Sequence, residues 1–352
     1  MKICELFNLY AGGDLDKENY SKYQTTKYCF PIYSNSLTNK GLYGYTSRPR
    51  YKEDSITITG RGTIGVAEFR KDKFDAIIRL LVLEKKTNNL SQYITYYINH
   101  FIKFNVESTG VPQLTVPQIK NIEIKLPDLS VQKNVVEYLT NIEKYIKSLE
   151  KLIEKKKLIK QGVMQELLTG KKRLPGFNKE WSLESNIFKF VKGKQVSHQE
   201  LDGFGKYKMY NGGISFSGLY PDYNYEDKII ISEGGNSCGF VNYIKTKFWA
   251  GGHCYVIISC DLDKEFLYQL LKFNQNKIMS LRVGSGLPNI QAKNLSKMNF
   301  YFPTSKQEQI EIGKILTDMD EEINSLEQDL EKYKQIKQGM MERLLTGKIR
   351  VV

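Results

Sequence analysis

Two stretches of this sequence are nearly identical and lie about half a chain length apart. Residues 159–171 read IKQGVMQELLTGK and residues 336–348 read IKQGMMERLLTGK, with ten of the thirteen positions identical. Towards the N-terminus the match continues at a nearly constant offset: STGVPQL at 108–114 corresponds to GSGLPNI at 284–290, and KFDA at 73–76 to KFWA at 247–250. A chain that repeats itself in this way is predicted to be a tandem duplication of one folding unit.

The first part of each copy contains short β-type runs separated by Gly, Asn and Pro, which is typical of short strands. Examples are SITITGRGTIGVAEF at 55–69, KIIISEGGNSCGFVNYI at 228–244 and HCYVIIS at 253–259. Helical segments at 91–104 and 264–273 lie between such runs. Each copy is therefore predicted to begin with a globule of mixed α/β structure.

The second part of each copy predicts one long helix. Apolar residues recur at steps of four and three from Ile312 to Leu344, and the matching positions run from Val135 to Leu167. Lys337 in the second copy, and Lys156 and Lys160 in the first, interrupt this stripe. An apolar period of 3.5 residues over about four heptads indicates a coiled-coil seam. At about 1.5 Å per residue, each helix would be about 50 Å long.

Glycines mark the ends and the middle of both predicted helices. Gly170 and Gly347 stand where a helix C-terminus favours glycine. Gly162 and Gly339 fall inside the helical pattern, where glycine costs about 1 kcal/mol relative to alanine. Two interpretations of the inner glycines remain open, a tolerated kink or the close approach of another helix.

The order globule, helix, globule, helix predicts the architecture. A pseudo-twofold relation between the copies would pair the two helices antiparallel and place one globule at each end of a spacer. The fold class is thus two mixed α/β domains joined by two long antiparallel coiled-coil helices. The predicted parts are the first globule at 1–129, the central helix at 130–170, the second globule at 171–306 and the distal helix at 307–348.

The charge of the chain favours a polyanionic partner. Lys and Arg number 52 against 39 Asp and Glu, a formal net charge of +13, and a basic excess is most often matched by nucleic acid. The alternative is an AT-rich genome, which produces Lys- and Asn-rich proteins of any function. The five cysteines form no CxxC pair, and no apolar segment reaches the roughly 20 residues that cross a bilayer, so we expect a soluble, cytoplasmic protein.

The repeated segments resemble those of the specificity subunits of type I restriction–modification systems. KQGVMQELLTGKKRLPGF and KQGMMERLLTGKIRV resemble the ends of that family's central and distal conserved helices. GVPQLTVPQIKNIEIKLPDLSVQKNVVEYL and GLPNIQAKNLSKMNFYFPTSKQEQIEIGKIL resemble its passage into those helices, where Pro is followed by Glu-Gln and an Ile-Leu seam. The second copy keeps Glu308-Gln309, whereas the first has Val131-Gln132.

The resemblance implies a subunit that has no catalytic activity and no cofactor of its own. Its globules would be target recognition domains, each reading one half of a bipartite site on double-stranded DNA through the major groove. Its helices would set the spacer and dock two modification subunits, which bind S-adenosylmethionine and methylate adenine. Two restriction subunits would add DNA translocation and cleavage with ATP and Mg.

Other motifs do not support an enzyme or a metal site. GRGTIG at 60–65 fits the dinucleotide fingerprint but continues into a β-like run instead of opening a helix, and the matching EGGNSC lacks its second glycine. The segment from Gly162 to Lys171 has seven residues between its glycines, whereas a P-loop has four. His100, His198 and His253 are scattered, and no Asn-Pro-Pro-Tyr motif for adenine methylation is present.

Base reading requires polar side chains on loops, and phosphate binding requires cations. Because the copies share a scaffold, specificity should lie where their polar residues differ. In the first globule the candidates are Tyr33, Asn35, Asn39, Lys40, Arg48, Arg50, Arg61, Thr63, Ser108, Thr109 and Gln113. In the second they are Lys206, Lys208, Tyr210, Asn211, Ser215, Ser217, Asn236, Ser237, Arg282, Ser285, Asn289 and Gln291.

Two other functions remain open on the sequence. One is the recognition subunit of a related type II system with a fused methylase and nuclease. The other, from a different class, is a coiled-coil assembly scaffold whose globules bind protein and show no preference for a DNA sequence.

Overall fold

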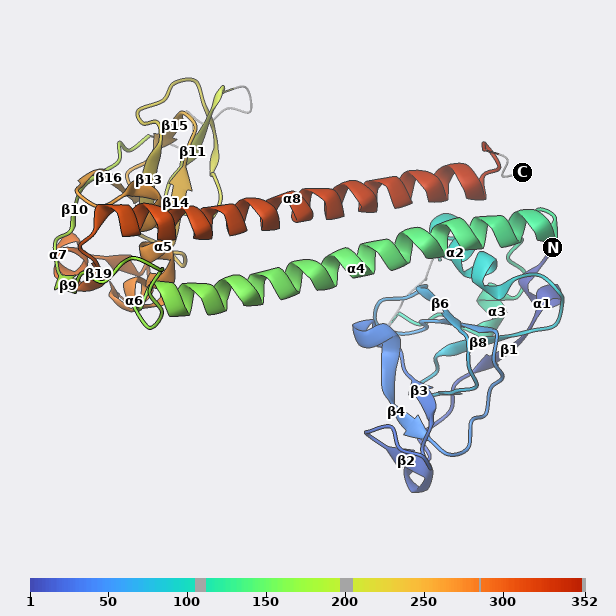
Figure 1. Ribbon diagram of the computed structural model, residues 1–352. Coiled ribbons are helices and arrows are strands. Elements are labelled where there is room, and N and C mark those ends of the chain that lie inside the picture. The colour runs from blue at the N-terminus through green and yellow to red at the C-terminus, as the bar shows by residue number, and fades with distance from the viewer. Residues whose placement is uncertain (105–111, 197–204, 285, 350–352) are drawn as a thin grey trace. The chain divides into compact units, whose positions relative to one another are not determined.

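The computed structural model describes residues 1–104, 112–196, 205–284 and 286–349, and the chain divides into two compact units. Unit 1 comprises Met1–Leu149 and Asp329–Val352, and unit 2 comprises Glu150–Gln328. Two long helices, α4 (Leu129–Leu167) and α8 (Lys306–Leu345), each contribute to both units. Every unit therefore consists of a globule and one segment from each long helix (Figure 1).

The first globule contains two four-stranded sheets. One is antiparallel, in the order β1-β8-β5-β6, and α2 (Ser91–Phe101) packs on it. The other has the order β2-β4-β3-β7, and its β3–β7 pair is parallel. The strands are β1 (Phe7–Ala11), β2 (Tyr20–Ser21), β3 (Phe30–Tyr33), β4 (Leu42–Thr46), β5 (Ser55–Ile58), β6 (Ala67–Arg70), β7 (Asp75–Ala76) and β8 (Leu81–Lys85). The short helices are α1 (Ile3–Leu6), η1 (Lys17–Asn19), η2 (Thr38–Gly41) and α3 (Val116–Ile119).

The second globule repeats this topology. Its antiparallel sheet has the order β10-β16-β13-β14, and its second sheet, β12-β11-β15, again contains one parallel pair, β11–β15. The strands are β9 (Trp181–Glu184), β10 (Phe188–Lys192), β11 (Tyr207–Tyr210), β12 (Gly218–Tyr220), β13 (Lys228–Ser232), β14 (Val241–Ile244), β15 (Phe248–Ala250), β16 (Cys254–Cys260), β17 (Arg282–Val283), β18 (Asn289–Ile290) and β19 (Phe300–Pro303). The helices are α5 (Lys264–Phe273), α6 (Gln275–Ser280) and α7 (Ala292–Ser296). The predicted fold class, with two mixed α/β domains in a tandem repeat, is confirmed.

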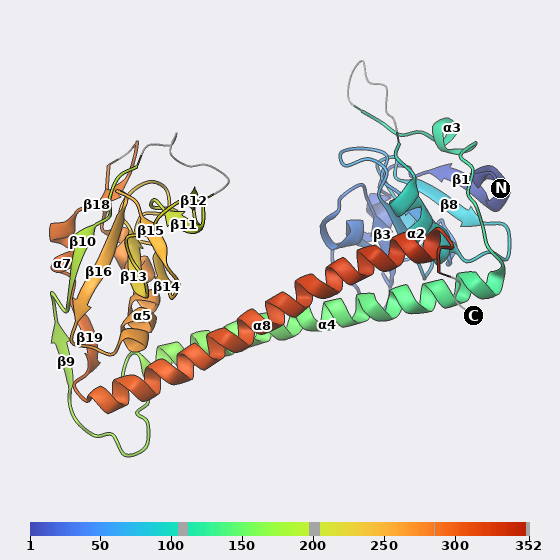
Figure 2. The same ribbon diagram turned by 90° about the horizontal axis from the view of Figure 1, so that it is seen from above.

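Each globule completes its core with residues from the end of a long helix. Leu344 and Leu345 of α8 are buried in the core of unit 1, which also contains α2 and the start of α4 (Figure 2). The repeat-related Leu167 and Leu168 are buried in the core of unit 2. The apolar ends of the repeated LLTGK motif therefore belong to the two hydrophobic cores.

The long helices run antiparallel in both units, and their lysines form ion pairs. In unit 1, Lys337 Nζ lies 2.7 Å from a carboxylate oxygen of Glu143. In unit 2, Lys160 Nζ lies 2.5 Å from Asp320. The lysines that interrupt the apolar stripe are therefore paired across the seam, a device that can fix helix register.

A neighbouring seam position differs between the units. Tyr145 and Tyr333 contact each other in unit 1, with ring centroids 4.4 Å apart. At the repeat-related positions of unit 2, Lys156 and Glu322 form an ion pair of 2.6 Å. The same position of the seam therefore holds an aromatic pair in unit 1 and an ion pair in unit 2.

A buried glutamine fixes the entry into each long helix. The Gln132 side chain accepts from Leu90 N–H at 3.0 Å and donates to Pro127 O at 2.8 Å. The Gln309 side chain makes the same two bonds: it accepts from Asp263 N–H at 2.9 Å and donates to Pro303 O at 2.8 Å. Both glutamine side chains are buried and satisfy backbone groups beside the start of a long helix, which explains why both copies have glutamine here.

The glycines at the helix ends and those inside the helices have different environments. Gly170 and Gly347 both have φ +71°, as predicted for residues that end a helix. A Cβ at Gly162 or Gly339 would have no neighbour within 4 Å among the described residues, apart from the helix's own backbone. Among the described residues, therefore, no other helix approaches the inner glycines closely.

Candidate nucleic-acid interface

Loops of the first globule converge at one edge of its sheets, and we call them loop cluster 1. It comprises residues 12–14, 34–41, 59–66 and 77–80. The Asn35 side chain connects three of these loops, because it donates to Ile78 O at 2.5 Å and accepts from Gly60 N–H at 2.7 Å. Backbone bonds join the fourth, with Ile78 N–H donating to Gly13 O at 2.9 Å.

Two glycines allow these loops to pack closely. A Cβ on Gly12 would lie 2.7 Å from backbone atoms of Ala76. Gly65 has φ +88°, a conformation that other residues rarely adopt, and its N–H donates to Thr59 O at 2.8 Å. Gly65, the last glycine of the GRGTIG segment, therefore shapes a tight loop.

The second globule gathers the equivalent loops, which we call loop cluster 2. It comprises residues 193–195, 211–217, 233–240, 251–254 and the described part of 284–291. Asn211 Oδ1 accepts from His253 N–H at 3.2 Å, and Glu233 N–H donates to His253 O at 2.8 Å. Ile290 N–H donates to Glu233 O at 2.8 Å and so attaches the β17–β18 hairpin.

Several predicted DNA-contact residues have structural roles. Arg50 Nε donates to the buried Asp75 at 2.6 Å, which also holds the pKa of the Arg50 guanidinium above its usual value. Tyr33 lies under the guanidinium of Arg70, whose carbon is 3.5 Å from the ring centroid. Tyr210 is buried against Phe248, and burial raises the pKa of its hydroxyl. Like Asn35 and Asn211, these side chains support the loops.

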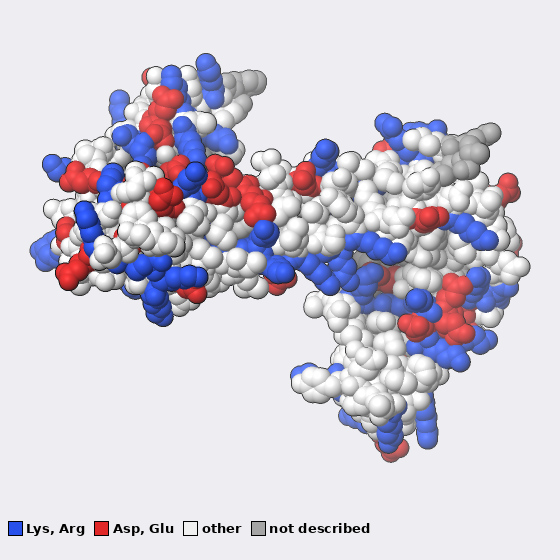
Figure 3. Space-filling model, viewed as in Figure 1, with Lys and Arg blue, Asp and Glu red and all other residues white. Residues whose placement is uncertain are grey.

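The other candidates are more accessible. Exposed in loop cluster 1 or beside it are Asn39, Lys40, Arg61 and Thr63, with Gln113 half-buried and 3.3 Å from Arg61. Arg48 is also exposed, but it follows the end of β4 that lies opposite to the loop 34–41. Exposed in loop cluster 2 or beside it are Lys208, Ser215, Ser217, Asn236, Arg282, Asn289 and Gln291, with Ser237 half-buried. Lys206 is also exposed, but it precedes β11 at the end of that strand opposite to the loop 211–217. Ser108, Thr109 and Ser285 lie outside the described residues. On the face in Figure 3, basic side chains are interleaved with acidic ones over both units.

Sequence reasoning missed polar residues that the loops place in these clusters. Arg79 is exposed in the turn 77–80, and His253 lies in the matching turn 251–254. Lys192 and Lys194 flank the start of loop cluster 2. The repeat could have pointed to this pair, since Arg79 follows KFDA and His253 follows KFWA at the same distance, and the two residues differ in type.

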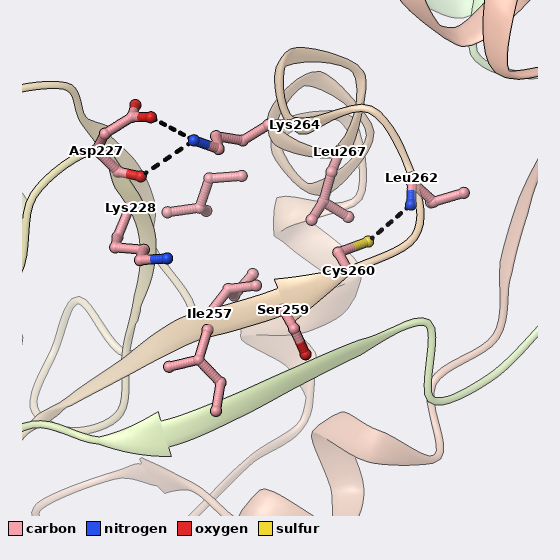
Figure 4. Close-up of a pocket in the computed structure, with 10 residues that line it drawn as sticks. Asp227, Lys228, Ile257, Ser259, Cys260, Leu262, Lys264 and Leu267 are labelled. Atoms are coloured by element: carbon pink, nitrogen blue, oxygen red, sulfur yellow. Dashed lines mark hydrogen bonds and ion pairs between the residues drawn. The ribbon is translucent and has the colours of Figure 1, made fainter.

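The structure also shows a cavity of about 220 Å³ in unit 2, between β13, β16 and α5 (Figure 4). Ile257, Leu262 and Leu267 contribute apolar walls, while Asp227 and Lys264 pair with each other at its side. Small-molecule sites usually exceed about 300 Å³ and gather several free polar groups. This cavity therefore does not indicate a ligand site.

Among the described residues, no three His, Cys, Asp or Glu side chains gather in a way that could hold a metal ion. None of the helices in this part of the chain combines the length and apolar character needed to cross a bilayer.

The family model and the related proteins that match this chain all point to the same family. The model of the type I restriction modification DNA specificity domain matches residues 1–161 and 182–338. A type I restriction enzyme specificity subunit of Methanocaldococcus jannaschii is 23% identical, over 96% of this chain and 88% of that protein. A putative type I specificity subunit of Mycoplasma genitalium is 28% identical over 46% of this chain and 43% of its own length, so this chain matches less than half of that relative.

A solved structure shares the fold. The crystal structure of a type I restriction–modification system S subunit from M. genitalium superimposes with a TM-score of 0.77 at 19% identity. The superposition covers 98% of this chain and 95% of the other.

Proposed function

Because this chain belongs to the family of type I restriction modification DNA specificity domains, we propose that it selects the DNA sequence on which a restriction–modification complex acts. Each loop cluster reads one half of a bipartite site on double-stranded DNA. The chain itself has no catalytic role and takes no cofactor; S-adenosylmethionine belongs to the modification subunits, and ATP and Mg belong to the restriction subunits. It works where the DNA is, in the cytoplasm.

The observation that carries this proposal is the repetition of one framework with different loop residues. Both globules keep the same strand order and the same parallel pair, and both gather loops at the equivalent edge. The side chains exposed there differ, with Arg61 in loop cluster 1 and Asn236 in the matching loop of cluster 2. A duplicated scaffold with diverged polar loops suits the reading of two different half-sites.

The exposed candidates of both clusters are the residues we propose for DNA contact. Cations such as Lys208 and Arg282 would bind phosphates, and amides such as Asn289 would read base edges. Arg50, Tyr33 and Tyr210 would position the loops instead, since their side chains are already engaged.

The long helices would fix the spacing of the half-sites and dock one modification subunit on each unit. Ile159 and Ile336, which are related by the repeat, are 44% and 39% exposed on α4 and α8. Three residues further along, Gly162 and Gly339 leave open space on the helix surface. The same apolar residue beside the same gap recurs in both units, which fits two copies of one partner.

Methylation mapping tests the proposal. Deleting this gene should remove methylation at one bipartite motif, and restoring it should bring that motif back. Exchanging residues 1–130 for the first globule of another family member should change only one half of the motif. The proposal fails if the motif persists without the gene, or if the exchange alters both halves or neither.

A further inference from the structure

One turn has the same hydrogen bonds in both loop clusters but carries different side chains. In the turns 77–80 and 251–254, the fourth N–H donates to the first carbonyl, at 3.2 Å in unit 1 and 3.1 Å in unit 2. The first N–H of each turn donates to the last residue of the neighbouring strand, Tyr33 O at 2.9 Å or Tyr210 O at 2.7 Å. The two turns are therefore equivalent parts of the repeated framework.

The central residues of these turns differ in backbone conformation. Ile78 and Arg79 have φ +55° and φ +60°, the left-handed region at both central positions of a turn. Gly252 and His253, their counterparts, have no such positive φ. The same anchor points thus carry turns of different backbone conformation.

The left-handed conformation of Ile78 is held from several sides. A β-branched residue rarely adopts positive φ and does so only where its surroundings require it. Here Ile78 donates to Gly13 O at 2.9 Å and accepts from Asn35 Nδ2 at 2.5 Å, while Arg79 N–H donates to Gly12 O at 3.0 Å. Strain that is fixed in this way typically orients a functional group, and the group at this turn is the Arg79 side chain.

Arg79 presents donors only. Its side chain is exposed and makes no hydrogen bond or ion pair with any other described residue. An exposed arginine side chain on a backbone fixed in this way matches the two acceptors that guanine shows in the major groove, N7 and O6. Arg50, in contrast, is occupied by Asp75 and cannot serve this purpose.

His253 offers a hydrogen-bond acceptor where Arg79 offers donors. Its Nδ1 lies 3.2 Å from Glu233, a carboxylate that is only 12% exposed and also binds Lys192 Nζ at 2.9 Å. A carboxylate only accepts hydrogen bonds, so in the neutral ring Nδ1 carries the proton and Nε2 is an acceptor. The imidazole is 54% exposed, and an acceptor there matches the amino group of adenine or cytosine.

We propose that Arg79 and His253 are the matched base-reading residues of the two loop clusters, Arg79 for a guanine in one half-site and His253 for an amino-bearing base in the other. Glu233 is the positioning residue for His253. This inference rests on the proposed DNA-reading function, and it identifies the turn after the parallel strand pair as the reading element.

The test is methylation mapping by the complete complex containing the full chain or its variants. Arg79→Ala should remove the base requirement at one position of one half-site. The preference for the correct base over other bases, about 5- to 150-fold in the wild type, should fall to near unity there. His253→Ala should relax one base pair of the other half-site. Glu233→Ala should relax that same position, and combining it with His253→Ala should add nothing. Lys86→Ala, a loss of one exposed charge at the far end of β8, should leave the motif unchanged.

The outcomes separate base reading from simpler roles. If Arg79 only bound phosphate, Arg79→Ala would slow methylation at every sequence without changing the motif, and Arg79→Lys would restore the rate; that result overturns the proposal. Under base reading, Arg79→Lys keeps the charge but leaves the position partly relaxed. Circular dichroism of each variant identifies loss of folding, and in that case Arg79→Lys and Arg79→Gln decide the question. If the wild-type complex shows no bipartite motif, the proposed function itself is wrong.

Discussion

Lys337 on α8 and Glu143 on α4 form in unit 1 the ion pair that Lys160 and Asp320 form in unit 2. The positions correspond through the repeat, with the lysine on the opposite long helix in each case. The environments differ, because the Lys160 side chain is 14% exposed and that of Lys337 is 31% exposed. Asp320 also accepts from Gln269 Nε2 at 2.8 Å, which ties α5 to the seam.

Alanine double-mutant cycles should give unequal coupling energies for these two pairs. The Lys337–Glu143 pair should contribute less than about 1 kcal/mol, as is usual for accessible ion pairs. The Lys160–Asp320 pair should contribute about 1–3 kcal/mol, because it is more buried and belongs to a network. Urea unfolding of the single and double variants measures both, and equal couplings would show that burial is not decisive here.

Arg173→Ala should strongly destabilise unit 2. Arg173 binds Glu308 through two bonds of 2.7 Å, and Glu308 is fully buried, so removing the arginine leaves an unpaired buried carboxylate. Breaking such a pair costs about 3 kcal/mol or more. Adding Glu308→Val should recover most of the loss, because unit 1 has Val131 at the matching position. Thermal unfolding checks this, and a double variant no more stable than Arg173→Ala contradicts it.

Ile78→Gly should leave stability unchanged or raise it by up to about 1 kcal/mol. Glycine adopts positive φ without strain, and the isoleucine side chain is 48% exposed, so little burial is lost. Gly252 already occupies the matching position of unit 2. Ile77→Gly is the matched control, since Ile77 is 1% exposed and its loss should cost several kcal/mol. A destabilisation by Ile78→Gly as large as that of the control would refute the strain argument.

Gly162→Ala and Gly339→Ala should each stabilise their helix by about 0.5–1 kcal/mol, because no side chain of the described residues meets the added methyl group. Gly162→Leu and Gly339→Leu should fold equally well but weaken binding of a modification subunit, if the open surface is its docking site. Denaturation and titration calorimetry with the purified partner separate the two effects. Unchanged partner affinity in both leucine variants would place docking elsewhere.

The repeat made most of the fold predictable. Because both copies must fill the same framework, matched glycines, prolines and apolar runs fixed the strand-rich globules and the long helices. The lysines within the apolar stripe could not be interpreted, since the partners Glu143 and Asp320 lie on another helix at a distance that periodicity does not reveal.

The candidate site was predictable only as a set of loops. Residue type suggested Asn35 and Arg50 as DNA contacts, but their side chains hold backbone and carboxylate groups from other loops. Arg79 was missed because its position depends on a turn with two left-handed residues, which the sequence Ile-Ile-Arg-Leu does not suggest. The repeat shows only that Arg79 and His253 occupy equivalent positions and differ in type.

The burial of Leu344 and Leu345 in unit 1 has a consequence for synthesis on the ribosome. The first globule emerges early, yet the α8 residues that cover its core are made about 200 residues later. At about 5–20 residues per second, its apolar surface would stay uncovered for roughly 10–40 s. During that interval the nascent first globule is the species most exposed to aggregation and to chaperones, whereas unit 2 receives Leu167 and Leu168 before its own strands are made.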